Sequence, residues 1–278
     1  MLPVMRREVR LSAISIYPVK AFRGLDLQNS VVEPWGLEHD RRWMVVDERG
    51  RFLSQREVPT MALISASIER EGLRLRGSDN HELHIAEPEQ DAPVVEVSIW
   101  KDRVRARRAS PEADTWLAQR FGRPVSLVFM ADPARDRAVD PGYARPEDHV
   151  SFADGFPLLI TSRASLDDLN NRLASPLPMD RFRPNLVVEG TEPWDEDTWT
   201  RIRVGSAEFA TPKLCARCAV TTVDQQTGLR SADREPLRTL QTFRRGDNGQ
   251  VTFGQNLIPL GRAPVHVGDP VEVLAQRS

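Results

Sequence analysis

The chain has 278 residues, of which 40% are hydrophobic and 28% are charged, and its formal net charge is −2. This length allows one large domain or two ordinary ones, and the composition is that of a soluble globular protein. The near balance of charge argues against nucleic acid or a membrane surface as a partner, and no apolar run approaches the ~20 residues that span a bilayer.

Short strands dominate the first hundred residues. Residues 11–19 alternate around Ile14 and Ile16, and an apolar run at 42–47 is closed by a turn before the chain resumes at Arg51. Further strands are predicted at 62–69, 73–76, 82–86 and 94–100, separated by Gly, Asp, Asn and Pro. This density of strands favours a barrel or sandwich over a parallel α/β sheet.

A helix is predicted at 110–121, followed by a strand at 125–129. Ser110 is a good N-cap, Pro111 fits the first helical position, and Gly122 ends the helix. Residues 131–153 are rich in Pro, Asp and Arg and show no periodicity. A loop of this length is unusual in a compact domain, so we expect a lid or an inter-domain crossing.

The second half begins with a predicted strand at 157–161 and a helix from Ser165, where Ser165-Leu-Asp-Asp168 is a capping-box variant. A short helix is predicted from Pro236. Strands are predicted at 185–189, 200–204, 206–210, 219–224, 250–253 and 270–275. The fold class is therefore α+β and rich in β-structure, with few helices.

Cysteine content and the N-terminus predict the compartment. The first residues, Met-Leu-Pro-Val-Met-Arg-Arg-Glu, lack the apolar segment and the cleavage site of a signal peptide. Two cysteines in a chain of this size do not form a disulfide framework. We therefore expect a cytoplasmic protein.

Both cysteines lie in one segment, Lys213-Leu-Cys-Ala-Arg-Cys-Ala-Val-Thr-Thr-Val-Asp224. Arg217 stands between Cys215 and Cys218, and positive charge favours the thiolate over the thiol. The pair fits two small buried side chains, whereas a closed zinc site wants four ligands. A thioredoxin-type dithiol would open a helix, but the residues that follow predict a strand. The best functional interpretation is a lone thiolate that binds a soft metal or carries sulfur.

The histidines offer no comparable site. His81 and His84 lack the His-Glu-x-x-His spacing, and in a strand their imidazoles point to opposite faces, which favours a surface hairpin. His39, His149 and His266 are isolated in the sequence, so no Cys-His or Ser-His couple is predicted.

Two further segments have the chemistry of a binding site. Lys20 ends a strand and is followed by a turn with Gly24, a pattern that fits either an anion-binding site or a plain turn. An arginine of the Asp40-Arg-Arg-Trp43 run could lie beside Lys20 as a second cation. The segment Arg181-Phe-Arg-Pro-Asn185 places two guanidinium groups and a carboxamide before a strand. That set of donors and acceptors suits a flat heterocycle.

Together these segments resemble the MOSC-domain proteins of the molybdenum cofactor, of the two-domain kind with an N-terminal β-barrel-like module. Within that family the similarity is to the amidoxime-reducing components and to bacterial reductases of N-hydroxylated bases. It covers about residues 10 to 275 and implies a MOSC N-terminal β-barrel-like domain at 1–130 and a MOSC domain at 131–278. The segments that carry it, in order, are Tyr17-Pro-Val-Lys20, Gly36 to Asp47, Arg181 to Asn185, Cys215 to Asp224, Gln226-Thr-Gly228, Phe253-Gly-Gln-Asn256 and Val267 to Val271.

The resemblance assigns roles to individual residues. It implies that Cys218 ligates molybdenum as the metal-binding and catalytic residue, with the acidic Asp224 nearby as a second catalytic candidate. The cofactor-binding residues that it implies are Lys20 and Arg41 for the pterin phosphate, Arg183 and Asn185 for the pterin, Thr161 and Ser162 at a strand end, and Arg217 beside the metal ligand.

The implied activity is reduction of small N-hydroxylated substrates, such as hydroxylamines, amidoximes and N-hydroxylated bases, by the molybdenum cofactor (molybdopterin with Mo), with a role in detoxification. Ala21 follows Lys20 where the mitochondrial relatives have serine, so one hydroxyl contact to the phosphate is missing. The chain has no N-terminal anchor and no cysteines for an iron–sulfur cluster. We therefore expect a separate electron-donor protein of the flavin reductase, ferredoxin or cytochrome type.

Two other functions stay open at this point. One is a non-enzymatic carrier of the molybdenum cofactor or of sulfur, with a persulfide on Cys218. The other is a thiol redox protein that uses Cys215 together with Cys218.

Overall fold

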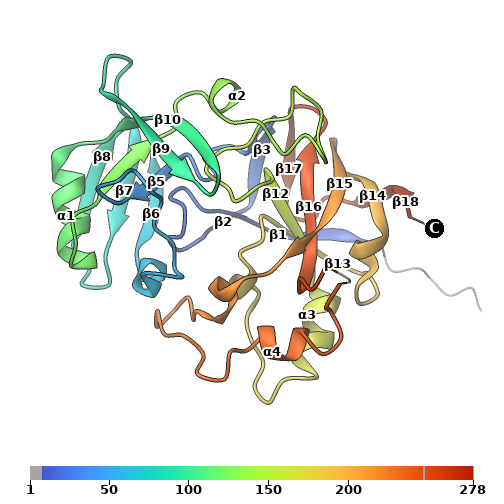
Figure 1. The fold of residues 1–278 in the computed structure, drawn as a ribbon. Coiled ribbons are helices and arrows are strands. Elements are labelled where there is room, and N and C mark those ends of the chain that lie inside the picture. The colour runs from blue at the N-terminus through green and yellow to red at the C-terminus, as the bar shows by residue number, and fades with distance from the viewer. Residues whose placement is uncertain (1–7, 247, 278) are drawn as a thin grey trace, which may run out of the picture.

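The computed structural model describes residues 8–246 and 248–277, and strands dominate it (Figure 1). The largest sheet has eight strands and is antiparallel except for the parallel pair β12–β13. Its order is β18 (Val271–Gln276), β14 (Trp199–Val204), β15 (Ala207–Ala216), β16 (Thr252–Pro259), β12 (Leu158–Ser162), β13 (Leu186–Glu189), β1 (Arg10–Ile16) and β2 (Leu25–Leu27). This confirms the predicted β-rich fold class.

Three smaller sheets surround the large one. One has the order β5 (Trp43–Val46), β11 (Ser126–Phe129), β10 (Asp102–Arg108) and β9 (Val94–Ile99). Another joins β17 (Ala263–His266), β3 (Asn29–Glu33) and β4 (Gly36–Leu37), and the last joins β6 (Ser65–Glu69), β7 (Gly72–Arg76) and β8 (Glu82–Ala86). The α-helices are α1 (Pro111–Phe121), α2 (Pro133–Asp136), α3 (Arg163–Asn170) and α4 (Leu237–Leu240), and the 3-10 helices are η1 (Pro59–Leu63), η2 (Met179–Phe182), η3 (Asp195–Thr198) and η4 (Ala219–Thr222).

The first strands of the chain pair with strands from its second half. β1 runs antiparallel to β13, with Ile14 opposite Leu186, and β3 pairs with β17. The side chains of Ile14 and Ile16 are buried in a core that also contains Trp199 and Phe209. Burial of these apolar groups stabilises the pairing, since each contributes about 1.5–3 kcal/mol. The segment that follows β1 is thereby fixed beside β12 and β13. The boundary at 130/131 stays a prediction.

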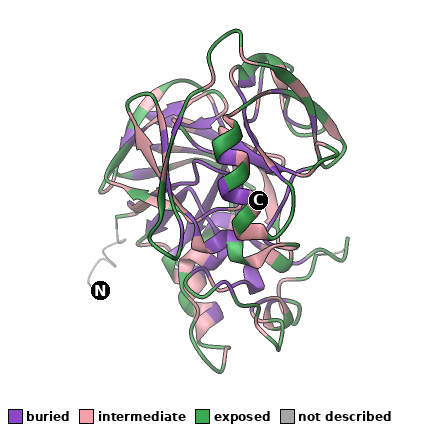
Figure 2. Cartoon of the chain, turned by 90° about the vertical axis from the view of Figure 1, so that its left-hand side faces the viewer, coloured by how far each residue is buried: buried purple, intermediate pink, exposed green. Residues whose placement is uncertain are grey.

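Helix α1 confirms the predicted helix and its ends. The Ser110 hydroxyl accepts a hydrogen bond from Ala113 N at 3.3 Å, and Gly122 adopts the left-handed conformation that ends the helix. Its inner face buries Trp116 and Leu117, while its outer face is exposed, as Figure 2 shows. At 11 residues it is the longest helix among the described residues, and none of these helices is long and apolar enough to cross a membrane.

The strand predicted at 219–224 is wrong. Residues Ala219–Thr222 form the 3-10 helix η4, because the hydroxyls of Thr221 and Thr222 donate to the carbonyls of Cys218 and Ala219. These side-chain bonds stabilise a turn where β-branched residues otherwise favour a strand. The absence of a helix after Cys218 was the argument against the dithiol alternative, and the helix η4 removes that argument.

Other element boundaries also differ from the predictions. Helix α3 begins at Arg163 with Ser162 as its N-cap, two residues before the predicted start at Ser165. Strand β15 continues to Ala216 and β16 to Pro259 because each pairs with the other well beyond the predicted ends. Strands β2, β3, β4, β10 and β17 were not predicted. All but β10 are short, and pairing with neighbouring strands stabilises them, whereas β10 lies between β9 and β11.

Residues 131–153 connect β11 of the four-stranded sheet to β12 of the large sheet. The buried Arg137 fixes the end of this crossing: its guanidinium pairs with Asp102 at 2.9 Å and donates to the carbonyls of Ser151, Ala153 and Asp154. His149 makes a bridge to Ala138 within the same crossing. Whether the segment also gates a site stays a prediction.

Gly254 offers a test of the fold beside β12. Its φ is +77°, and a Cβ there would lie 2.6 Å from the Ile160 carbonyl oxygen. We expect Gly254→Ala to destabilise the protein by about 2–5 kcal/mol, from left-handed strain plus overpacking. Gly122→Ala is the matched control, because its φ of +65° is similar but nothing lies within 4 Å. It should cost only about 1–2 kcal/mol in denaturant unfolding. Equal losses would contradict the described packing.

Candidate functional site

A cavity of about 320 Å³ opens between the large sheet and the segments that follow β1 and β5. Six of the residues singled out from the sequence line it: Lys20, Arg41, Arg183, Asn185, Arg217 and Cys218. They come from both halves of the chain. The structure therefore brings together groups that are almost 200 residues apart in sequence.

Positive charge dominates the lining. Its cations are Lys20, Arg41, Arg56, Arg183, Lys213 and Arg217, and its single carboxylate is that of Asp154. Like charges gathered in a partly enclosed space repel one another and are poorly screened by solvent. An anionic ligand relieves this repulsion, so the cavity is built for one.

Lys20 is held at one side of the cavity. Its backbone N donates to the Trp43 carbonyl, and its ammonium donates to the Phe152 carbonyl at 2.8 Å and to Asp154 Oδ1 at 2.6 Å. Only 6% of the residue is exposed, and this burial lowers the pKa of Lys20 to about 8 in spite of the opposing charge of Asp154. Enclosure opposes ionisation of Asp154, but the charge of Lys20 outweighs it and holds the pKa of that carboxyl below its usual range.

Arg41 and Arg183 both pack on the ring of Tyr17. Their guanidinium carbons lie 4.4 and 4.2 Å from the ring centroid, and the Tyr17 hydroxyl donates to the Pro184 carbonyl at 3.0 Å. Burial of Tyr17 raises the pKa of its hydroxyl above the usual range, and burial of Arg183 lowers the pKa of that guanidinium to about 10. The aromatic ring thus keeps two cations close together, which the π-face of tyrosine favours.

Backbone strain accompanies these side chains. Ala21, Arg41 and Arg183 all line the cavity, and their φ angles of 70°, 50° and 54° lie in the left-handed region. Residues other than glycine adopt this conformation at a cost of about 1–3 kcal/mol each. Such strain collects at functional sites, where it fixes the direction of a side chain or a backbone amide.

Asn185, which directly precedes β13, bonds to β1, to β12 and to the turn that holds Arg41. Its Oδ1 accepts from Arg41 at 3.1 Å and from Leu159 N at 3.2 Å, and its Nδ2 donates to the Ser15 carbonyl at 3.1 Å. Because the carboxamide is buried and bonded on both sides, its orientation is fixed. It in turn orients the Arg41 guanidinium, which also pairs with the buried Asp40 at 2.5 Å.

Both cysteine thiols line the opposite side of the cavity. Cys215 lies in β15 and Cys218 is the N-cap of η4, and neither forms a disulfide. Each sulfur contacts its own guanidinium: Arg56 lies 3.5 Å from Cys218 Sγ, and Arg217 lies 2.9 Å from Cys215 Sγ. No group of three or more His, Cys, Asp or Glu side chains that suits a metal occurs within the described part of the chain.

Three of the predicted site residues lie outside the lining. Thr161 is buried and donates to Met179 Sδ, while Ser162 caps α3 and shares a hydrogen bond with Thr191. Asp224 pairs with Arg181 at 3.1 Å and accepts from the backbone N of Gln226 and Thr227, which orders the turn after η4. Partial burial alone would raise the pKa of Asp224, but these hydrogen bonds lower it by a larger amount. The pKa of this carboxyl therefore lies below its usual range. Their roles toward a cofactor stay predictions.

Several site residues were missed in the sequence. Gln55 and Gln225 exchange two hydrogen bonds of 2.9 and 3.0 Å, and Arg183 donates to Gln225 as well. Arg56 and Asp154 also line the cavity. Gln225 lies directly between two segments that were singled out, the one that ends at Asp224 and the one that begins at Gln226, which was a usable signal. The others lie in stretches with no distinctive pattern and are recognised only by their distant partners.

The comparisons with known proteins agree with this geometry. The MOSC N-terminal β-barrel domain matches residues 8–124 and the MOSC domain matches residues 147–272. Mitochondrial amidoxime-reducing component 1 of Danio rerio is 32% identical over 96% of this chain and 87% of its own, and the Homo sapiens protein is 31% identical over 94% and 82%. The molybdenum cofactor sulfurase of Oryza sativa is 32% identical over 89% of this chain but only 32% of its own length. The chain therefore belongs to the MOSC-domain family, among the members in which a MOSC N-terminal β-barrel domain precedes the MOSC domain.

Proposed function

We propose that this cavity binds the molybdenum cofactor and that the protein reduces N-hydroxylated compounds with electrons from a separate donor protein. The observation that carries the proposal is the meeting of the Cys218 thiol with a cluster of cations, of which Lys20 and Arg183 are buried, in one cavity. The names of the amidoxime-reducing relatives support the reaction, and those of the sulfurase relatives support the cofactor.

The donor set fits the phosphate end of such a cofactor. Lys20 and Arg41 supply charge from neighbouring segments, and the buried Ser54 hydroxyl, which also lines the cavity, has no protein partner for its Oγ among the described residues. A buried hydroxyl without a partner is costly, and a phosphate oxygen would satisfy it. The hydroxyl that is missing at Ala21 therefore has a candidate replacement in Ser54.

The middle of the cavity fits the pterin. Arg183 offers a planar guanidinium, and the Arg217 Nε is buried without a protein partner in the described part of the chain. Flat heterocycles with ring nitrogens and carbonyls match such planar donors. Phe182 lies at the same wall and stacks on Phe253 with 3.9 Å between ring centroids, which keeps the wall rigid.

Cys218 would ligate the metal, and its neighbour Arg56 lies 3.5 Å from the sulfur. When bound, the cofactor supplies the two electrons that cleave the N–O bond and leave an amine and water. The two protons must come from another source, and Asp154 is a poor one because it remains ionised near neutral pH. We therefore assign proton supply to solvent that enters the open cavity.

The donor protein and the compartment remain part of the proposal. A flavin reductase, a ferredoxin or a cytochrome is the expected donor, and the cytoplasm is the expected location. A role in detoxification of N-hydroxylated compounds would follow from the activity.

A carrier of cofactor or sulfur is the second candidate. The similarity to plant molybdenum cofactor sulfurase supports it, because that match covers 89% of this chain. A carrier would bind cofactor exchangeably and show no turnover of N-hydroxylated substrates.

The two cysteines provide a direct test. We expect Cys218→Ser to lose the molybdenum, which the wild type should retain at about one atom per chain, together with reductase activity, because serine is a poor ligand for a soft metal. Cys215→Ser is the matched control, since its sulfur lines the same cavity, and it should keep the metal and at least about half of the activity. Metal analysis and substrate reduction, with protein from a host that makes the cofactor, measure both. Equal loss in the two variants would favour the dithiol alternative.

The low pKa of Lys20 predicts a pH dependence. Below about pH 8 the ammonium is charged and binds an anion, and above that pH it becomes neutral. Sulfate, a stand-in for phosphate that stays a dianion, should bind cofactor-free protein about tenfold more weakly at about pH 9.5 than at about pH 7. Isothermal titration calorimetry measures this change. Lys20→Arg should show a much flatter profile, because the new arginine stays charged, while Arg183, with a pKa of about 10, affects both proteins alike. A wild-type profile as flat as that of the variant would contradict the assignment.

A further inference from the structure

The tip of the β9–β10 hairpin carries a tryptophan in a strained conformation. Ile99 pairs with Asp102, so Trp100 and Lys101 form the turn, and the φ of Trp100 is 54°. Turns of this type favour glycine or asparagine at such a position. The Trp100 residue is also 52% exposed. Neither the turn nor the core therefore accounts for an indole here.

The indole lies against three residues of the cavity lining. The guanidinium of Arg56 is 4.4 Å from the Trp100 ring, and the ring of Phe52 is 5.2 Å away. The indole Nε1 donates to Asp154 Oδ1 at 3.3 Å. Trp100 consequently stands at the mouth of the cavity, with one side packed on its wall and a large part of its surface free.

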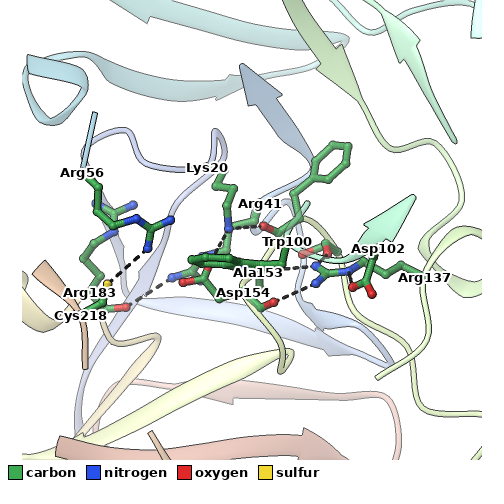
Figure 3. A network of polar contacts seen from close by, with 12 residues as sticks. Lys20, Arg41, Arg56, Trp100, Asp102, Arg137, Ala153, Asp154, Arg183 and Cys218 are labelled. Carbon is green, nitrogen blue, oxygen red and sulfur yellow. Dashed lines mark hydrogen bonds and ion pairs between the residues drawn. The ribbon is translucent and has the colours of Figure 1, made fainter. Parts of the chain in front are cut away.

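Its neighbours link the two chemical ends of the site (Figure 3). Arg56 contacts Cys218 Sγ at 3.5 Å, and Asp154 contacts the Lys20 ammonium at 2.6 Å. Arg137 fixes the backbone of Asp154, since its guanidinium donates to the Asp154 carbonyl at 2.8 Å. Trp100 is thus one residue away from both the thiol and the anion-binding lysine, through its contacts with Arg56 and Asp154.

We propose that Trp100 determines substrate specificity and that Arg56 binds the oxygen of the N-hydroxyl group. The exposed indole stacks on planar, conjugated N-hydroxylated compounds, such as aromatic amidoximes or N-hydroxylated bases, and positions their N–OH group near Cys218. This inference rests on the proposed function. It adds a preference of this site for planar substrates over small aliphatic hydroxylamines.

The chemistry of both groups suits this task. An aromatic amidoxime is flat, so it matches the face of an indole, whereas an aliphatic hydroxylamine has no π-surface to stack. Guanidinium has five N–H donors, and a single side-chain hydrogen bond, to Cys218, involves that of Arg56 within the described residues. The remaining donors are free to bind the N–OH oxygen, which both kinds of substrate share.

Trp100→Ala in the holoenzyme tests the stacking. With a reduced viologen dye as donor, kcat/KM for benzamidoxime should fall about tenfold, through KM, while kcat/KM for N-methylhydroxylamine stays within about twofold. Molybdenum content should be unchanged. Trp100→Phe should keep most of the benzamidoxime activity. Val94→Ala is the control, because Val94 is similarly exposed, at 49%, but begins β9 at the end opposite the hairpin tip.

Arg56→Met tests the other half. Because the N–OH group is common to both substrates, kcat/KM should fall about tenfold or more for each of them. Unchanged kinetics with both substrates would overturn the role of Arg56. Equal losses for the two substrates in Trp100→Ala, or no loss, would overturn the role of Trp100.

Binding measured by calorimetry separates this inference from the proposed function. Benzamidoxime should bind the oxidised wild-type holoenzyme about tenfold more tightly than Trp100→Ala. If the wild type binds in this Trp100-dependent way but reduces neither substrate, the proposed reduction is wrong and the stacking site stands. If it reduces both substrates and binding does not depend on Trp100, the stacking site is wrong and the reduction stands.

Discussion

The antiparallel pairing of β1 with β13 is the constraint on which the site depends. The Asn185 carboxamide donates to the Ser15 carbonyl across a sequence separation of 170 residues. That register delivers Tyr17 and Lys20 to the end of β13, where Arg183 and Asn185 lie. Because side chains alternate along a strand, a slip of one residue would turn the Ile14 row out of the core and move the lysine away from the cavity.

The electrostatics of the cavity follow from this arrangement. Two charges 4 Å apart interact by about 4 kcal/mol at an effective dielectric constant of 20, so adjacent guanidinium groups are unfavourable without compensation. The Tyr17 ring between Arg41 and Arg183, together with the buried Asp40, offsets part of that repulsion. Burial is the main cause of the depressed pKa values of Lys20 and Arg183, and a smaller contribution comes from repulsion by the Arg41 guanidinium. A bound anion would relieve this repulsion between the cations. The cavity therefore favours negatively charged ligands in general, independently of the specific hydrogen bonds that each ligand makes.

Local patterns predicted what local physics determines. The ends of α1 were predictable because Ser110 and Gly122 act on the backbone of their own helix. Lys20, Arg41 and Cys218 were found through their motifs, although no local rule places them in one cavity. The strand expected after Cys218 was wrong, since the threonine hydroxyls bond to nearby carbonyls and override β-propensity. Arg56 and Asp154 were invisible in the sequence, because what distinguishes them is contact with residues 162 and 134 positions away.

The reciprocal amide pair of Gln55 and Gln225 has a consequence for how such proteins diversify. Each carboxamide uses the other as donor and acceptor, and the Gln55 Oε1 accepts its hydrogen bond from Gln225 of the other half of the chain. A recombination event that exchanged one module for a distant relative's would leave a buried amide without its complement and would tilt the Arg183 guanidinium that Gln225 holds. The two modules are therefore expected to be inherited as one unit, and their sequences to drift in step at this seam.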